Sequence, residues 1–193
     1  MLLVENISSK LLPTISLQAS QGDCICIHGE SGTGKTLLLR AIADLDENLG
    51  NISLDNQNRN HMAPEAWRKL VTYLPTDSYW WSSQVIDHFN PSSEDLASLA
   101  LHQNIRNWDV LRLSSGEKQR LALLRTLTHQ PKVLLLDEVT ANLDVDNTQR
   151  VEQLLNEKLK QGLIIIWVTH DKEQRQRMAT SSFQLTKSSL IQD

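Results

Sequence analysis

The feature that most constrains this chain is the segment Gly29-Glu30-Ser31-Gly32-Thr33-Gly34-Lys35-Thr36, which fits the pattern G-x-x-x-x-G-K-[ST]. Its three glycines let the backbone adopt positive φ and approach an anion without Cβ clashes. Successive N–H groups then form a concave nest, and a helix that follows adds its positive end. Lys35 offers a charge to the β- and γ-phosphates, and Thr36 offers a hydroxyl to Mg²⁺. The segment predicts a nucleoside triphosphate site.

The residues on either side of this phosphate loop support a strand–loop–helix unit. Cys24-Ile25-Cys26-Ile27 is an apolar run typical of a buried strand, and residues 37–43 suit a helix. The alternative is a glycine-rich turn that fits the pattern by chance, and such a turn requires neither a strand before it nor a helix after it. The two cysteines alternate along the strand and point the same way. We expect them to pack in the core of a protein from a reducing compartment, with a metal or redox role as the alternative.

Composition and charge limit the class of protein. A chain of 193 residues with 40% hydrophobic and 22% charged residues suits one globular domain, residues 1–193. The net charge of −4 provides no reason to expect a nucleic-acid partner. No apolar run is long enough to cross a bilayer, and residues 1–6 lack the regions of a signal peptide. We therefore expect a soluble, cytosolic protein.

Apolar runs alternate with helical segments along the chain. Strands are expected at 1–7, 14–17, 24–27, 52–55, 70–74, 133–136 and 163–168, with a terminal hairpin at 183–191. Helices are expected at 37–45, 63–69, 84–89, 93–102, 115–129, 145–161 and up to about 178, with turns or loops at 12–13, 48–51 and 56–61. This alternation predicts an α/β fold with a mainly parallel sheet, a small antiparallel N-terminal part and a short helical lobe inserted at about 76–113. The ligand is expected at the carboxyl ends of the parallel strands.

A second chemical segment is Val133-Leu134-Leu135-Leu136-Asp137-Glu138, an apolar strand that ends in two carboxylates. Asp137 is placed to hold Mg²⁺ opposite Thr36, and Glu138 to orient a water molecule for attack on a γ-phosphate. Many α/β strands end in acidic residues, so this pattern alone indicates little. It indicates a metal and water site here because a phosphate loop is also present.

A third segment is Leu113-Ser114-Ser115-Gly116-Glu117-Lys118-Gln119-Arg120. Ser114 can cap the helix that follows, and an ordinary N-cap is as good an interpretation of this residue as any role in ligand binding. The small pair Ser115-Gly116 allows the N-terminus of that helix to approach an anion.

Taken together, these segments resemble an ATP-binding cassette (ABC) ATPase domain, a P-loop nucleotidase. Five segments occur in the order of that family: Walker A at 29–36, the signature Leu-Ser-Gly-Gly-Gln at 113–120, Walker B at 133–138, the D-loop at 139–144 and the switch histidine at 168–171. A lone histidine at a strand end is ordinarily a surface residue. His170, however, follows an expected buried strand beside the phosphate site, so a role in the site is favoured. Asp144, the acidic end of the D-loop, can also cap the helix after it.

The resemblance implies a mechanism that depends on ATP and Mg²⁺. Two such domains, either two copies of this chain or this chain and a close relative, sandwich two ATP molecules head to tail. The phosphate loop of one then faces Ser114, Ser115, Gly116 and Asp144, or their equivalents, in the other. Glu138 polarises the water, while Lys35 and His170 contact the phosphates and steady the transition state. It further implies a separate integral membrane transporter subunit, and hence a cytoplasmic position at the inner face of the membrane.

Three segments depart from the family pattern, two of them outside the signature. The glutamine that usually follows the strand at 70–74 is replaced by Thr76 and Asp77, which puts a contact to the metal in question. The aromatic residue that usually stacks on adenine is missing from residues 9–12, where Leu11 or Leu12 is left to make an aliphatic contact.

The signature itself carries Ser115 in place of glycine and Glu117 in place of glutamine, which brings a negative charge near a phosphate site. The aromatic patch Tyr79-Trp80-Trp81 opens the lobe, where the family docks its membrane partner. Packing in the core of the lobe is the first interpretation of the patch, and an interface is the second.

The favoured function is therefore the ATPase subunit of a membrane transporter. The alternative within the family is an ABC protein that acts on nucleic acid or ribosomes, although such relatives carry tandem cassettes or basic extensions. A small P-loop kinase would explain the phosphate loop but not residues 113–120 or His170.

Overall fold

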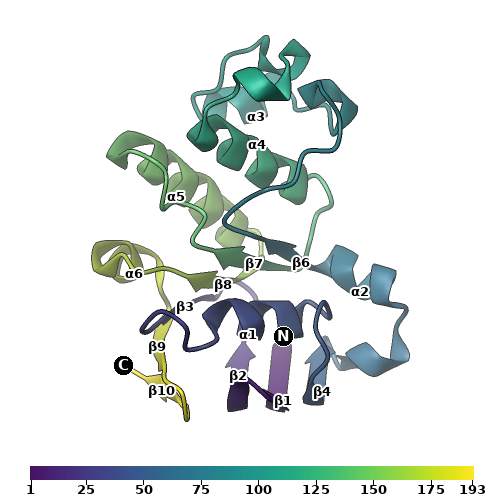
Figure 1. The fold of residues 1–193 in the computed structure, drawn as a ribbon, viewed down its shortest axis with the longest axis vertical. Helices are drawn as coiled ribbons and strands as arrows, with labels where there is room; N and C mark the ends of the chain where they lie inside the picture. Colours follow the sequence, from purple (N-terminus) through teal and green to yellow (C-terminus); the bar gives the residue numbers. More distant parts are fainter.

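The computed structural model describes all 193 residues and contains two sheets (Figure 1). The antiparallel sheet has the order β2-β1-β4-β5 and the larger sheet the order β10-β9-β3-β8-β7-β6, in which only β10 is antiparallel to its neighbour. The strands are β1 Leu2–Ser9, β2 Leu12–Ala19, β3 Cys24–His28, β4 Leu49–Leu54, β5 Gln57–Asn58, β6 Val71–Leu74, β7 Val133–Asp137, β8 Ile164–Val168, β9 Ser181–Leu185 and β10 Leu190–Gln192. The α-helices are α1 Lys35–Ile42, α2 Pro64–Leu70, α3 Ser93–Ser98, α4 Ser115–Leu127, α5 Val145–Lys160 and α6 Lys172–Met178. The predicted α/β fold with a mainly parallel sheet is confirmed.

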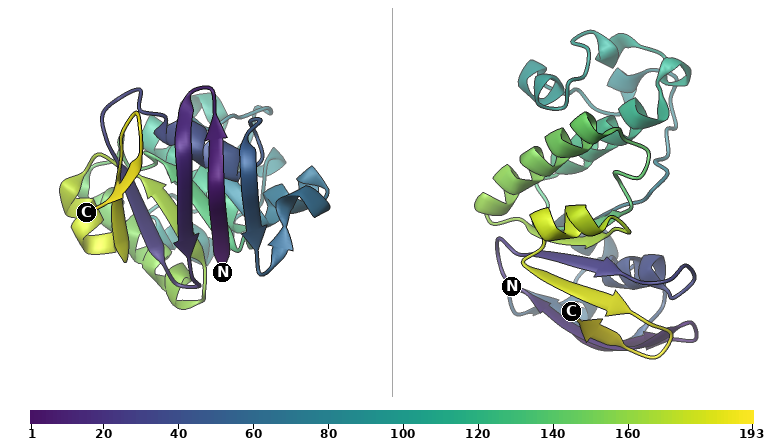
Figure 2. Two further views of the ribbon diagram at one scale, coloured as in Figure 1. Left: turned by 90° about the horizontal axis from the view of Figure 1, so that it is seen from below. Right: turned by 90° about the vertical axis from the view of Figure 1, so that its left-hand side faces the viewer.

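The central strands β3, β8 and β7 are buried on both faces, and each face has its own core. Ile25 and Ile27 point into a cluster that also contains residues of α1 and of the antiparallel sheet. Cys24 and Cys26 point to the opposite face, which α4 and α5 cover (Figure 2). Both thiols are fully buried, and a hydrogen bond with Cys26 together with burial raises the pKa of Cys24. This geometry matches the expected packing role.

Two expected turns in the N-terminal part are wrong. Residues 12 and 13 do not separate two strands but belong to β2, where Pro13 is tolerated because β2 is an edge strand. Residues 48–51 are not a turn, since β4 begins at Leu49 and Gly50 forms a bulge with φ of 94° opposite β1. The expected polar loop at 56–61 contains β5 and a 3₁₀ turn, Arg59–His61.

Residues 76–113 lie at the end of the molecule away from the antiparallel sheet (Figure 1). The helix expected at 84–89 is only the 3₁₀ turn Val85–Asp87, and the helix expected at 93–102 ends at Ser98. Two further 3₁₀ turns, Ile105–Asn107 and Val110–Arg112, lead to α4. None of the helices of the chain is long and apolar enough to span a bilayer.

Candidate nucleotide-binding site

The phosphate loop joins β3 to the N-terminus of α1, at the carboxyl edge of the parallel sheet. Gly29 has φ of 144°, and a Cβ atom there would clash with the carbonyl oxygen of Leu185 on β9. Gly34 is the N-cap of α1 and has φ of 100°, in the left-handed region. These two positions require glycine because the loop must turn tightly against the sheet and expose its N–H groups.

Lys35 and Thr33 brace the loop from inside. Lys35 Nζ donates hydrogen bonds to the carbonyl oxygens of Gly29 and Glu30, at 3.0 and 2.9 Å. Thr33 Oγ1 donates to the same Glu30 oxygen at 2.9 Å. The ammonium group is therefore held across the curve of the loop, where a bound phosphate would meet it.

Two hydroxyl groups converge on the buried carboxylate at the end of β7. Thr36 Oγ1 and Tyr73 Oη both donate to Asp137 Oδ2, at 2.8 and 2.9 Å. Burial and the Asp137 carboxylate together raise the pKa of Tyr73, so the phenol stays protonated and remains a donor. Thr36 and Asp137 are hard oxygen ligands next to a phosphate loop, and this set fits Mg²⁺. Tyr73 was not among the residues predicted from the sequence.

Glu138 and His170 form a pair at the mouth of the same site. The distance between His170 Nε2 and Glu138 Oε1 is 3.1 Å. Glu138 has φ of 51°, an unusual value for a residue with a side chain, and its N–H donates to the Val168 carbonyl oxygen on β8 at 2.9 Å. Backbone conformations of this kind are concentrated at functional sites, where surrounding contacts hold them in place.

The predicted phosphate, catalytic and metal residues therefore meet in one place. A pocket of about 340 Å³ is lined by Leu11, Ser31, Gly32, Gly34, Lys35, Thr36, Leu37, Glu138 and His170. Leu11 is 76% exposed at the rim, whereas Leu12 is 3% exposed in the core. Of the two leucines considered for the aliphatic contact, only Leu11 lines the pocket.

Thr76, which stands where the family has glutamine, is engaged with the backbone. Its Oγ1 donates to the Asp137 carbonyl oxygen at 2.9 Å, and Asp77 is exposed. Thr76 thus fixes the end of β7 rather than extending a polar group into the pocket.

The signature segment lies outside this pocket and starts α4. Ser114 is the N-cap: its Oγ accepts from Glu117 N at 3.2 Å, and Glu117 Oε2 accepts from Ser114 N at 2.8 Å. The Glu117 carboxylate, expected to bring a charge near phosphate, is thus occupied in a capping box. Ser114 and Ser115 are exposed, and a Cβ on Gly116 would lie 3.1 Å from Leu143 Cδ2 in the D-loop.

Asp144 also combines the two interpretations offered for it. It is the N-cap of α5, where its Oδ1 accepts from Asn147 N at 2.8 Å, and this hydrogen bond lowers the pKa of Asp144. The residue is exposed beside the signature segment. The predicted site residues therefore fall into two clusters, a pocket and an exposed surface.

The aromatic patch is largely exposed. Tyr79 and Trp81 are 77% and 59% exposed, and only Trp80 packs against the core. The Arg125 guanidinium stacks on the Trp80 and Trp81 rings, 4.7 and 4.9 Å from their centroids. Burial in the core of the lobe thus explains Trp80 alone.

Comparisons with known proteins agree with this geometry. The family model described as ABC transporter matches residues 12–141. The "Probable iron export ATP-binding protein FetA" of Escherichia coli (strain K12) is 32% identical over 86% of this chain and 80% of its own length. The "Arginine transport ATP-binding protein ArtP" of Haemophilus influenzae is 30% identical over 96% of this chain and 86% of its own.

Solved structures have the same fold. The dimeric post-hydrolysis state of the ATP-binding cassette MJ0796, bound to ADP and Pi, superimposes with a TM-score of 0.83 at 22% identity, over 100% of this chain and 98% of the other. A bacterial Atm1-family ABC exporter with ATP bound superimposes with a TM-score of 0.86 at 22% identity, over 98% of this chain and 38% of the other.

Proposed function

This chain belongs to the ABC transporter family and is an ATPase of that family, and we propose that its hydrolysis of ATP powers transport by a separate integral membrane subunit. The chain would act as one domain, residues 1–193, with the lobe at 76–113 inserted in it. The observation that carries the proposal is the convergence of the phosphate loop, Glu138 and His170 on one pocket, while the signature segment stays outside it.

Within the pocket, the N–H groups of residues 29–36 and the Lys35 ammonium bind the phosphates of ATP. Thr36 and Asp137 would hold Mg²⁺, which when bound supplies positive charge against the phosphate oxygens. Glu138 accepts a hydrogen bond from the attacking water and orients it. His170, 3.1 Å from Glu138, donates to the γ-phosphate and stabilises the charge of the transition state.

The site is completed by a second copy of the chain. Ser114, Ser115, Gly116 and Asp144 lie outside the pocket of their own chain and form an exposed surface that suits the pocket of a partner. ATP then acts as the contact between two surfaces that are incomplete without it, and hydrolysis releases them.

The exposed part of the aromatic patch supports a membrane subunit as partner. Tyr79 and Trp81 project from the start of the lobe, and the Arg125 guanidinium stacks on the rings of Trp80 and Trp81. Tryptophan, tyrosine and arginine side chains are enriched at interface hot spots. With such a partner, the chain would lie at the cytoplasmic face of the membrane. A net charge of −4 gives no electrostatic support for a nucleic-acid partner.

Two variants test the roles in the pocket. Lys35→Ala and Glu138→Gln should both abolish ATP turnover, but only Glu138→Gln should keep ATP bound and favour a dimer in gel filtration. Undiminished hydrolysis by Glu138→Gln would refute the role of that carboxylate. Affinity capture from detergent-solubilised membranes tests the partner: an integral membrane protein supports the proposal, and RNA or DNA in its place refutes it.

A further inference from the structure

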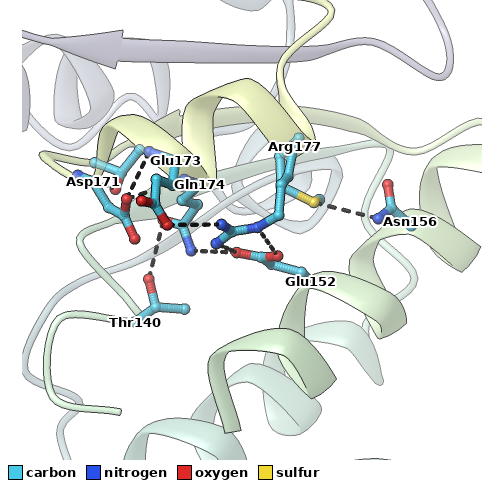
Figure 3. A network of polar contacts seen from close by, with 9 residues as sticks. Thr140, Glu152, Asn156, Asp171, Glu173, Gln174 and Arg177 are labelled. Atoms are coloured by element: carbon cyan, nitrogen blue, oxygen red, sulfur yellow. Dashed lines mark hydrogen bonds and ion pairs between the residues drawn. The ribbon is translucent and has the colours of Figure 1, made fainter. Parts of the chain in front are cut away.

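A polar network joins Thr140, α5 and α6 (Figure 3). Gln174 of α6 is fully buried at its centre. Its Oε1 accepts from Thr140 Oγ1 at 3.2 Å, and its Nε2 donates to Glu152 Oε1 at 3.1 Å. Arg177 holds Glu152 from the other side with hydrogen bonds of 2.9 and 2.8 Å. The amide thus bridges a neutral donor and a buried carboxylate, a task that requires both a donor and an acceptor at one position.

The network ends close to both catalytic residues. Thr140 lies two residues after Glu138, in a turn closed by a 3.0 Å backbone hydrogen bond onto the Glu138 carbonyl oxygen. Asp171 directly follows His170, and its Oδ1 accepts from Gln174 N at 3.1 Å. Gln174 is therefore bonded through its backbone to the neighbour of His170, and through its side chain to the turn after Glu138.

The surroundings of the turn make this bridge important. A cavity of about 400 Å³ lies beside it, lined by Glu138, Thr140, His170, Asp171 and Arg177 among others. Because this side of the turn faces open space rather than packed side chains, packing alone does not fix it there. The Thr140–Gln174 hydrogen bond crosses from the turn to α6 and restrains the turn on this side.

We propose that Gln174 is a positioning residue for ATP hydrolysis, which sets the placement of Glu138 relative to His170 by bonding the Thr140 turn to α6. The inference rests on the proposed functions of Glu138 and His170. Gln174 does not line the phosphate pocket, so it acts on the reaction through the two residues that do.

The test uses steady-state ATP hydrolysis by the purified full chain. Thr140→Val and Gln174→Met keep side-chain volume but remove the hydrogen bond, and each should lower kcat about tenfold, since small misplacements of reacting groups have effects of this size or larger. KM for ATP should stay within about twofold, because ATP binding belongs to other residues. Thr140→Ser restores the hydroxyl and should restore kcat. The double variant should lose no more than either single variant, since both remove one shared contact.

A matched control is Asn156→Ala. Asn156 Nδ2 contacts Met178 Sδ at 3.3 Å, so this change removes another contact between α5 and α6 without touching the turn, and kcat should stay at the wild-type value. If Thr140→Val and Gln174→Met lower the melting temperature but keep kcat, the network is only structural and the inference is overturned. Additive losses in kcat would mean that the two residues act independently, which also overturns it.

The outcome also separates this inference from the proposed function. A wild-type chain that hydrolyses no ATP overturns both. Hydrolysis that is lost in Glu138→Gln but unchanged in Gln174→Met leaves the proposed function standing and overturns the positioning role.

Discussion

Arg177→Met should destabilise the chain through the carboxylate that it leaves behind. The Glu152 side chain is 6% exposed, and Arg177 donates to both of its oxygens at 2.9 and 2.8 Å. Removing one partner of a fully buried ion pair costs about 3–5 kcal/mol. Here the Arg177 side chain is 42% exposed, so water already screens the pair, and Glu152 keeps its hydrogen bond from Gln174. We therefore expect a loss of about 2 kcal/mol.

For a domain of this size, such a loss corresponds to a fall in melting temperature of about 4–8 °C. Thermal unfolding followed by circular dichroism measures it, with urea unfolding as an independent determination of the free energy. The informative control is the double variant Glu152→Gln/Arg177→Met. It removes the buried charge but keeps an amide oxygen that can accept from Gln174, so it should be more stable than Arg177→Met alone.

Two results would contradict this reasoning. An unchanged melting temperature in Arg177→Met would mean that the ion pair is worth no more than a surface pair. A double variant less stable than Arg177→Met would mean that the hydrogen bonds of Glu152, rather than its uncompensated charge, dominate the energetics.

Three further predictions follow from local geometry. Ser114→Asp keeps a good N-cap but adds a negative charge to the signature surface. The variant monomer should still bind ATP in equilibrium dialysis but should not form a dimer with ATP in gel filtration. Weaker ATP binding by the monomer would instead mean that Ser114 belongs to the pocket of its own chain. Gly50→Ala should lower the melting temperature, because its φ is 94° and a Cβ would lie 2.5 Å from a carbonyl oxygen of β1; unchanged melting would mean that the bulge is not strained. A hydrogen bond from Arg40 lowers the pKa of Asp46 below its ordinary value of 3.8. The pair therefore contributes stability above that pH, and this contribution is lost as the pH falls through the lowered pKa. Asp46→Asn should flatten that part of the pH–stability curve, and an unchanged curve would mean that the pair does not contribute to stability.

The chemistry of the pocket is largely readable from the sequence because it is local. The phosphate loop needs glycines and a lysine at fixed spacing, and Asp137 and Glu138 are consecutive residues at the end of one apolar strand. The parallel register then brings the segments together, since Asp137 pairs with Val168 two residues before His170. Alternating strands and helices are sufficient to predict that arrangement.

What escaped prediction depends on contacts between distant residues. Tyr73 reaches Asp137 only because β6 pairs with β7, and no spacing along the chain announces that contact. Glu152 and Gln174 are polar residues on helices, which a sequence pattern assigns to the solvent side. One signal was present: the sequence from Ser114 to Glu117 fits the capping box S-x-x-E, and this explains where the glutamate is engaged.

The two clusters of site residues differ in what their residues do within their own chain. Ser114 and Asp144 are N-caps, so each completes the local structure of its own helix while remaining exposed. The pocket, by contrast, is lined by Lys35, Thr36, Glu138 and His170 and has no signature residue in its lining. Each chain thus offers one pocket and one complementary surface. In the proposed dimer of two copies, a two-fold axis would pair them into two equal sites, because in such an interface each contact occurs twice. In the proposed dimer, binding of ATP and association of the chains are therefore one event, and hydrolysis at the Glu138–His170 pair ends both.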